Sequence, residues 1–128
     1  MPVTPEQLDS AASHLCGSHA SEVDRRNAAS RSYYGLFHFA TRYVDVNAQV
    51  SPSTLAGSTH QKLSEYFSSY STPPRDKAMR VKRVGILLRK CHKARCDADY
   101  QLRIDFTSDS LKLCRHDCEQ AINLIKGL

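Results

Sequence analysis

The sequence predicts an all-α fold, an up-and-down bundle of four main helices and one short helix. Five segments place apolar residues at the three- and four-residue spacing that gives a helix one buried face. No segment alternates apolar and polar residues over a length that would support a sheet. Because 128 residues are enough to bury a hydrophobic core, we expect one domain over residues 1–128.

The first two helices have recognisable boundaries. Thr4 can cap the first helix, Pro5 suits its first turn, and Gln7 can close a capping box. We expect this helix to run to about residue 18, where Gly17 introduces a short turn. The second helix is expected from residue 21 or 22 to about residue 46. A glycine inside it, Gly35, indicates close approach by another helix.

Loop-forming residues separate the remaining helices. Residues 47–58 are rich in Asn, Ser, Pro, Thr and Gly, which predicts a loop. A third, shorter helix is expected to start near residue 58 and to end at the Ser-Thr-Pro-Pro sequence of residues 71–74. The fourth helix is expected over residues 75–98, and the fifth from about residue 108.

The second helix presents two faces. One is an apolar stripe that we predict to be core: Tyr33, Leu36, Phe37 and Ala40. Arg31, Tyr34 and His38 follow at positions i, i+3 and i+7 and share a second face. This row predicts an anion or RNA-phosphate site with His38 as a proton shuttle, because the ordinary pKa of histidine is about 6.5. The alternative is that Tyr34 and His38 are partly buried and Arg31 is solvated.

The fourth helix is strongly basic. Residues 75–95 hold nine of the eighteen Lys and Arg residues, and Asp76 is the one acidic residue before Asp97. This density indicates phosphate binding, with a solvated basic face as the alternative. The candidate nucleic-acid or anion contacts here are Arg80, Arg83, Arg89, Lys90, Lys93, Asp99 and Tyr100. His92 and Arg95 join His38 as candidate catalytic residues.

Charge and cysteine content narrow the class of function. A net charge of +5 and a pI near 9.1 favour an anionic partner, either nucleic acid or an acidic protein. No apolar run is long enough to span a membrane and the start lacks a signal peptide, so we expect a cytoplasmic protein without membrane association.

Cys114 and Cys118, with His116, have ligand-like spacing but belong to an apolar stripe. We therefore expect reduced cysteines, no metal site and no cofactor.

Three segments, in order, resemble motifs of small prokaryotic HEPN-domain proteins. Residues 30–38, Ser-Arg-Ser-Tyr-Tyr-Gly-Leu-Phe-His, resemble the "SRxYYAxFH" helix of that family. Residues 59–67 begin with Thr-His and contain a later Leu and Phe. They are similar to the segment that follows this helix in one branch of the family. Residues 95–100, Arg-Cys-Asp-Ala-Asp-Tyr, are similar to its "RxxADY" signature. Order and spacing agree over roughly residues 20–126.

The resemblance implies an HEPN-like helical bundle that forms a homodimer with a basic cleft at the dimer axis. Many members of the family are metal-independent RNases or toxins. They are often encoded with a nucleotidyltransferase or antitoxin partner, in defence or toxin–antitoxin systems. The RNase members carry an Arg followed after four to six residues by a His, late in the bundle.

This chain departs from the RNase pattern, because no His follows Arg95 and the nearest one, His92, precedes it. We therefore expect an RNA- or nucleotide-binding component that is non-catalytic or regulatory. One alternative is a metal-independent RNase in which Arg95 or Arg31 holds phosphate and His38 or His92 moves protons. A second alternative is an immunity or antitoxin protein on the same scaffold.

Overall fold

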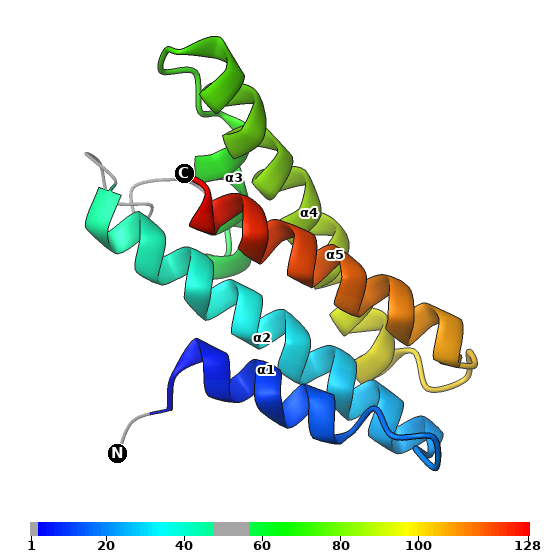
Figure 1. The fold of residues 1–128 in the computed structure, drawn as a ribbon. Helices are drawn as coiled ribbons and strands as arrows, with labels where there is room; N and C mark the ends of the chain where they lie inside the picture. Colours follow the sequence, from blue (N-terminus) through cyan, green and yellow to red (C-terminus); the bar gives the residue numbers. More distant parts are fainter. Residues whose placement is uncertain (1–2, 48–56) are drawn as a thin grey trace.

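The computed structural model describes residues 3–47 and 57–128 (Figure 1). Within them the chain forms an all-helical bundle with no strand, which confirms the predicted fold class. The helices are α1 (Pro5–His14), α2 (Glu22–Asn47), α3 (Thr59–Ser68), α4 (Arg75–Tyr100) and α5 (Ser108–Lys126). Since α1 and α3 have 10 residues each, the bundle has three long and two short helices rather than four and one.

The first helix starts as predicted and ends early. Thr4 and Gln7 form the capping box, with Gln7 Oε1 accepting from Thr4 N at 2.8 Å and Thr4 Oγ1 accepting from Gln7 N at 3.2 Å. α1 ends at His14, not near residue 18, because the N–H of Leu15 bonds to the Ala12 carbonyl at 3.1 Å and tightens the last turn. The loop predicted for residues 47–58 lies almost wholly outside the described residues.

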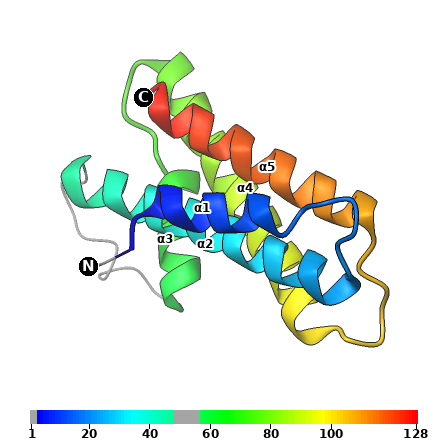
Figure 2. The same ribbon diagram turned by 60° about the horizontal axis from the view of Figure 1, so that its bottom comes forward.

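α1 lies along α2 and runs antiparallel to it (Figures 1 and 2). The contact is closest at Gly35, where an added Cβ would lie 3.3 Å from the Pro5 carbonyl oxygen and 3.5 Å from the Asp9 nitrogen. This confirms the close helix approach that the glycine predicts, and identifies α1 as the neighbouring helix. An exposed ion pair of 2.7 Å between Arg42 and Glu6 also joins the two.

The core forms where α2, α4 and α5 meet, and α3 packs mainly against α4 and adds Leu63 and Phe67 to the same core. α5 lies beside α4 and runs antiparallel to it (Figure 1). The predicted stripe of α2 is buried at Tyr33, Leu36 and Ala40, while Phe37 is partly buried against the same core. No helix within the described residues is long and apolar enough to cross a membrane.

α3 approaches α4 so closely that the contact requires a glycine. A Cβ added to Gly85 would lie 2.7 Å from the backbone nitrogen of Ser68 and 3.0 Å from the Ser64 carbonyl oxygen. Real Cβ atoms do not approach backbone this closely, so only glycine fits without a shift. This contact holds the second half of α3 against the first half of α4.

A buried arginine of α2 holds the end of α4. Arg26 is only 8% exposed and forms an ion pair of 3.2 Å with Glu22. Its guanidinium donates hydrogen bonds to four backbone carbonyls, those of Asp97, Ala98, Gln101 and Ile104. Three of these belong to the last turn of α4 and the residue after it. Arg26 therefore holds the end of α4 and the residues after it, 97–104, against α2.

Candidate anion-binding site

A buried arginine lies at the centre of the candidate site. Arg95, on α4, is only 6% exposed. Its guanidinium carbon lies 5.3 Å from the ring centre of Tyr34 and 5.6 Å from that of Tyr33. A third ring, that of Tyr100, is 5.9 Å away. The negative faces of aromatic rings attract a cation, and this attraction offsets part of the cost of removing Arg95 from water.

The hydrogen bonds of Arg95 are incomplete. Its Nη1 donates to Asp99 Oδ2 at 3.2 Å, and Ser30 Oγ on α2 donates to the same oxygen at 3.4 Å. The Nε of Arg95 is buried and has no hydrogen-bond partner among the described residues. Since a buried unpaired N–H costs free energy, this group is a donor that a bound anion could satisfy.

Two histidines complete the site next to Tyr33. His60 Nδ1, on α3, is 2.6 Å from the Tyr33 hydroxyl oxygen. The His60 ring stacks on that of His92, with 4.6 Å between ring centres and 24° between planes. His92 Nε2 lies 3.6 Å from Cys96 Sγ. We call the following residues the arginine–histidine cluster: Ser30, Tyr33, Tyr34, His60, His92, Arg95, Asp99 and Tyr100.

Burial keeps the two imidazoles neutral. Desolvation lowers the pKa of His60 below 6.5, and the neighbouring His92 and Arg95 lower it further. Desolvation and the charge of Arg95 lower the pKa of His92 in the same way. Burial raises the pKa of Tyr33, so its hydroxyl keeps a proton to share with His60. At neutral pH each imidazole can therefore both donate and accept a hydrogen bond, and a bound anion would raise both pKa values.

The predicted row on α2 lies beside this cluster. The guanidinium of Arg31 is 5.8 Å from the Tyr34 ring centre, and the His38 ring stacks on Tyr34 at 6.2 Å. All three residues line an open groove of about 790 Å³ between α1 and α2. Tyr34 belongs both to this groove and to the arginine–histidine cluster, since its ring also lies against Arg95. The structure thus brings Arg31, Tyr34 and His38 together, with His38 on the groove side.

The cations of α4 are neutralised by carboxylates more fully than the sequence indicates. The ion pairs are Arg80–Asp76 (3.4 Å), Arg89–Glu65 (2.9 Å), Lys90–Asp117 (3.1 Å) and Lys93–Asp97 (2.8 Å). Glu65 comes from α3 and Asp117 from α5, so neither was visible as a partner in the sequence. Arg83 instead lines a hollow of about 370 Å³ beside α5. These ion pairs reduce the charge repulsion along α4.

Sequence analysis left three members of the cluster out of the candidate site. Tyr33 belongs to an apolar stripe, which suggested packing, His60 was noted only as part of the motif of residues 59–67, and Ser30 carries no distinctive pattern. The available signal was that each lies in one of the three segments that carry the family resemblance. The structure shows that these segments meet, through the Ser30–Asp99 and Tyr33–His60 hydrogen bonds.

The cysteines do not form a metal centre. Cys114 and Cys118 are buried, whereas His116 is exposed on the same helix. In residues 3–47 and 57–128, no group of three or more His, Cys, Asp or Glu side chains is arranged to hold a metal ion.

No protein-family model, curated protein or solved structure matches this chain. The functional proposal therefore depends on the arginine–histidine cluster and on the resemblance of three sequence segments to HEPN motifs.

Proposed function

We propose that this chain is an HEPN-like protein that binds RNA or a nucleotide through the arginine–histidine cluster. In this proposal it is a non-catalytic or regulatory component of a toxin–antitoxin or defence-type system. The supporting observation is the unpaired Nε of Arg95, at the point where residues 30–38, 59–67 and 95–100 meet. These are the segments whose sequences resemble HEPN motifs.

The cluster offers the groups that a nucleotide requires. A guanidinium is the side chain best suited to a phosphate, because its N–H groups donate to several oxygens at once. The neutral rings of His60 and His92 add N–H donors at the partly exposed side of the cluster. Tyr100 is 71% exposed and Tyr34 is half-buried, so both present ring faces on which bases can stack.

The first test measures binding of a short fluorescein-labelled single-stranded RNA at low salt. Arg95→Gln should weaken binding about 10- to 100-fold, because a charge-assisted hydrogen bond contributes about 1.5–3 kcal/mol. Arg80→Gln is the matched control, since Arg80 is on the same helix, exposed and paired with Asp76. It should change affinity about twofold or less.

Circular dichroism on both variants establishes that the helices are retained. Equal loss of affinity in the two variants would show that binding is a diffuse effect of charge. The proposal would be refuted if the wild-type protein bound neither the RNA nor nucleoside phosphates.

A specific observation favours RNA cleavage as a second candidate function. The two stacked imidazoles lie beside Arg95 and are partly exposed. One neutral imidazole could take the proton of a ribose 2′-hydroxyl as it attacks the adjacent phosphorus, and the other, once protonated, could donate to the leaving oxygen. Arg95 would stabilise the charge that develops on the phosphate.

Cleavage is tested by incubating the protein with total RNA and tRNA in the presence of EDTA. We expect products ending in a 2′,3′-cyclic phosphate, with the rate reduced about 100-fold or more by His92→Gln and by His60→Gln. His38→Gln, on the groove side, is the control and should retain activity. Loss of activity in His38→Gln alone would reassign the proton transfer to the Arg31–Tyr34–His38 row, and an inactive wild-type protein would leave only the binding function.

The resemblance also leads us to propose that the chain acts as a homodimer with a nucleotidyltransferase or antitoxin partner. A dimer would place two arginine–histidine clusters in one assembly, and sedimentation of the purified chain measures its oligomeric state directly.

A further inference from the structure

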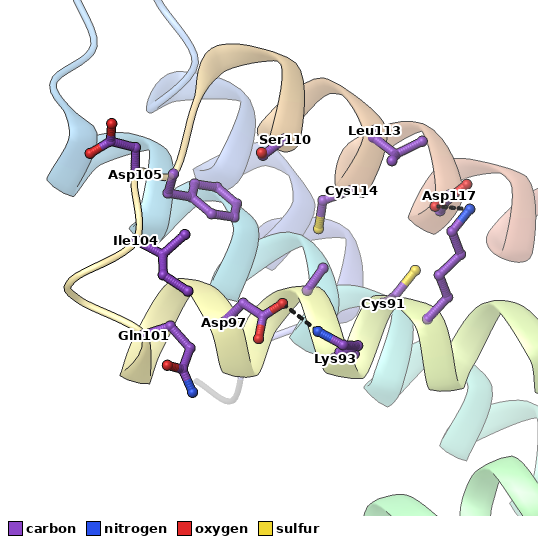
Figure 3. A pocket seen from close by; sticks show the side chains of 13 residues that line it. Cys91, Lys93, Asp97, Gln101, Ile104, Asp105, Ser110, Leu113, Cys114 and Asp117 are labelled. Carbon is purple, nitrogen blue, oxygen red and sulfur yellow. Dashed lines mark hydrogen bonds and ion pairs between the residues drawn. The ribbon is translucent and has the colours of Figure 1, made fainter.

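Two of the five cysteines are partly exposed. These are Cys16 and Cys96, whereas Cys91, Cys114 and Cys118 are buried, and all five are free thiols. Cys91 and Cys114 line a cavity of about 530 Å³ between α4 and α5, and Figure 3 shows their side chains on these two facing helices. None of the described residues that line this cavity is a histidine, so it offers neither thiol an imidazole.

Cys96 lies beside an imidazole. Its Sγ is 3.6 Å from Nε2 of His92, which is four residues earlier on α4. Burial and the charge of Arg95 lower the pKa of His92, so the ring is neutral at neutral pH. When the ring carries its proton on Nδ1, Nε2 accepts the S–H of Cys96. Because the thiolate is the nucleophilic form of cysteine, a base in contact with the S–H activates Cys96.

Cys16 is also partly exposed but has a different partner. Its S–H donates to the carbonyl oxygen of Ala12, with 3.1 Å between sulfur and oxygen. A backbone carbonyl accepts this hydrogen bond but does not take the proton at neutral pH. Cys16 is therefore a matched comparison for Cys96 within the same molecule.

Cys96 lies on the face of α4 that carries the arginine–histidine cluster. His92, Arg95, Cys96 and Asp99 occupy positions i, i+3, i+4 and i+7, which share one side of a helix. The His92 ring centre and the Arg95 guanidinium carbon lie 5.5 Å and 5.6 Å from the ring centre of Tyr33. Arg95 is only 6% exposed, and its Nε has no hydrogen-bond partner among the described residues. This side of α4 therefore combines an activated thiol with an unused donor for an anionic group.

We propose that Cys96, with His92 as its base, is a modification site that exchanges with a small anionic disulfide such as glutathione disulfide. His92 Nε2 takes the S–H proton, and the Cys96 sulfur attacks one sulfur of the reagent. A new S–S bond forms to Cys96, the S–S bond of the reagent breaks, and its other half leaves as a thiolate. This thiolate takes the proton from His92 and becomes a thiol. The Cys96 sulfur is oxidised and the leaving sulfur is reduced, so no other oxidant takes part.

The adduct would cover the partly exposed side of the arginine–histidine cluster, where its carboxylates would compete with a phosphate for Arg95. This consequence, unlike the exchange reaction, rests on the proposed function. Protein modified at Cys96 should bind the labelled RNA with an affinity lowered about 10-fold or more. Unchanged affinity would refute this consequence. If the unmodified protein bound no RNA, the proposed function would fail, while the exchange reaction would still be tested by its rate at Cys96.

The test incubates the native protein with glutathione disulfide, blocks the remaining thiols with N-ethylmaleimide in denaturant at successive times and maps tryptic peptides without reduction. Trypsin places Cys96 in a peptide of residues 96–103 and Cys16 in one of residues 1–25. The adduct should form at Cys96 about 10-fold faster or more than at Cys16, because only Cys96 has a base in contact with its S–H.

Two variants separate the roles of the neighbouring side chains. His92→Gln removes the base and should slow the reaction at Cys96 to about the rate at Cys16, which should not change. Arg95→Gln should reduce the preference of Cys96 for glutathione disulfide over the cationic disulfide cystamine, with each rate divided by that at Cys16. The three buried thiols should stay unmodified in a variant that remains folded.

Equal rates at Cys96 and Cys16 in the wild-type protein would overturn the proposal, and this comparison depends on no variant. An undiminished rate at Cys96 in folded His92→Gln would overturn it as well. So would a preference of wild-type Cys96 for cystamine on the same scale.

Discussion

At the scale of single residues, Arg95 combines a permanent charge with nearly complete burial. Three tyrosine rings and the Asp99 carboxylate surround the guanidinium, and each is close enough to stabilise a cation. The arrangement leaves Nε unsatisfied. A ligand that brought an oxygen to this group would stabilise it further, and this is the basis of the proposed anion binding.

Acidification should destabilise the folded protein through His60 and His92. Their pKa values are lowered in the fold, so below about 6.5 the unfolded chain binds more protons than the folded one. The free energy of unfolding should therefore decrease as the pH falls through this range. Urea unfolding at a series of pH values from about 7.5 to about 5 measures the effect.

The double variant His60→Gln, His92→Gln is the control for this pH dependence. It should show a smaller decrease in stability over the same range. An unchanged dependence in the double variant would mean that other groups cause it.

Individual residues differ in how well the sequence predicts their place. Arg31, Tyr34 and His38 could be grouped in advance because they belong to one helix, whose period fixes which side chains are neighbours. The stacking of His60 on His92 joins α3 to α4. Such a contact could not be predicted, because the periodicity within one helix carries no information on which other helix packs against it. For the same reason Glu65 and Asp117 could not be predicted as partners of the basic helix.

At the scale of the helix, boundaries follow from caps. Thr4, Ser58 and Thr107 all accept the backbone bond that starts a helix. The sequence predicts Thr4 as the cap of the first helix, and it leaves the choice open between residues 58 and 59 and between residues 107 and 108. The end of α1 was predicted too late because the last turn tightens at Leu15, which has no distinctive residue type. Starts are therefore better encoded locally than ends in this chain.

Replacing Gly85 by Ala should separate α3 from α4. The added methyl group would meet the backbone of Ser68, so the free energy of unfolding should decrease by about 1–3 kcal/mol. Gly17→Ala is the matched control, since no atom lies within 4 Å of its added Cβ, and it should change stability by about 0.5 kcal/mol or less. Chemical denaturation measures both, and similar losses would contradict the packing explanation.

At the scale of the whole molecule, Arg26 connects the start of α2 to the end of α4 and its link to α5. Arg26→Met should lower the free energy of unfolding by about 3 kcal/mol, because it leaves buried carbonyls without donors and Glu22 without its cation. Arg26→Lys keeps the charge but has no planar fork of donors, so an intermediate loss is expected.

The control for this prediction is Arg103→Ala, an exposed arginine on the α4–α5 connection, which should have little effect in the same urea titration. Full stability of Arg26→Lys would show that charge alone is needed. The all-helical architecture itself could be predicted from the apolar periodicity. The contact of Arg26 with the end of α4 could not, because the sequence alone does not distinguish Arg26 from an exposed surface arginine.

The bonds of Arg26 have a consequence for how this protein can change over evolutionary time. Apart from the ion pair with Glu22, they end on main-chain oxygens, which every amino acid carries, while the side chains of residues 101–105 are all exposed. Substitutions there leave the bonded atoms in place. Substitutions at residues 101–105 are therefore expected to change the surface beside Tyr100 while α2 and α4 stay joined.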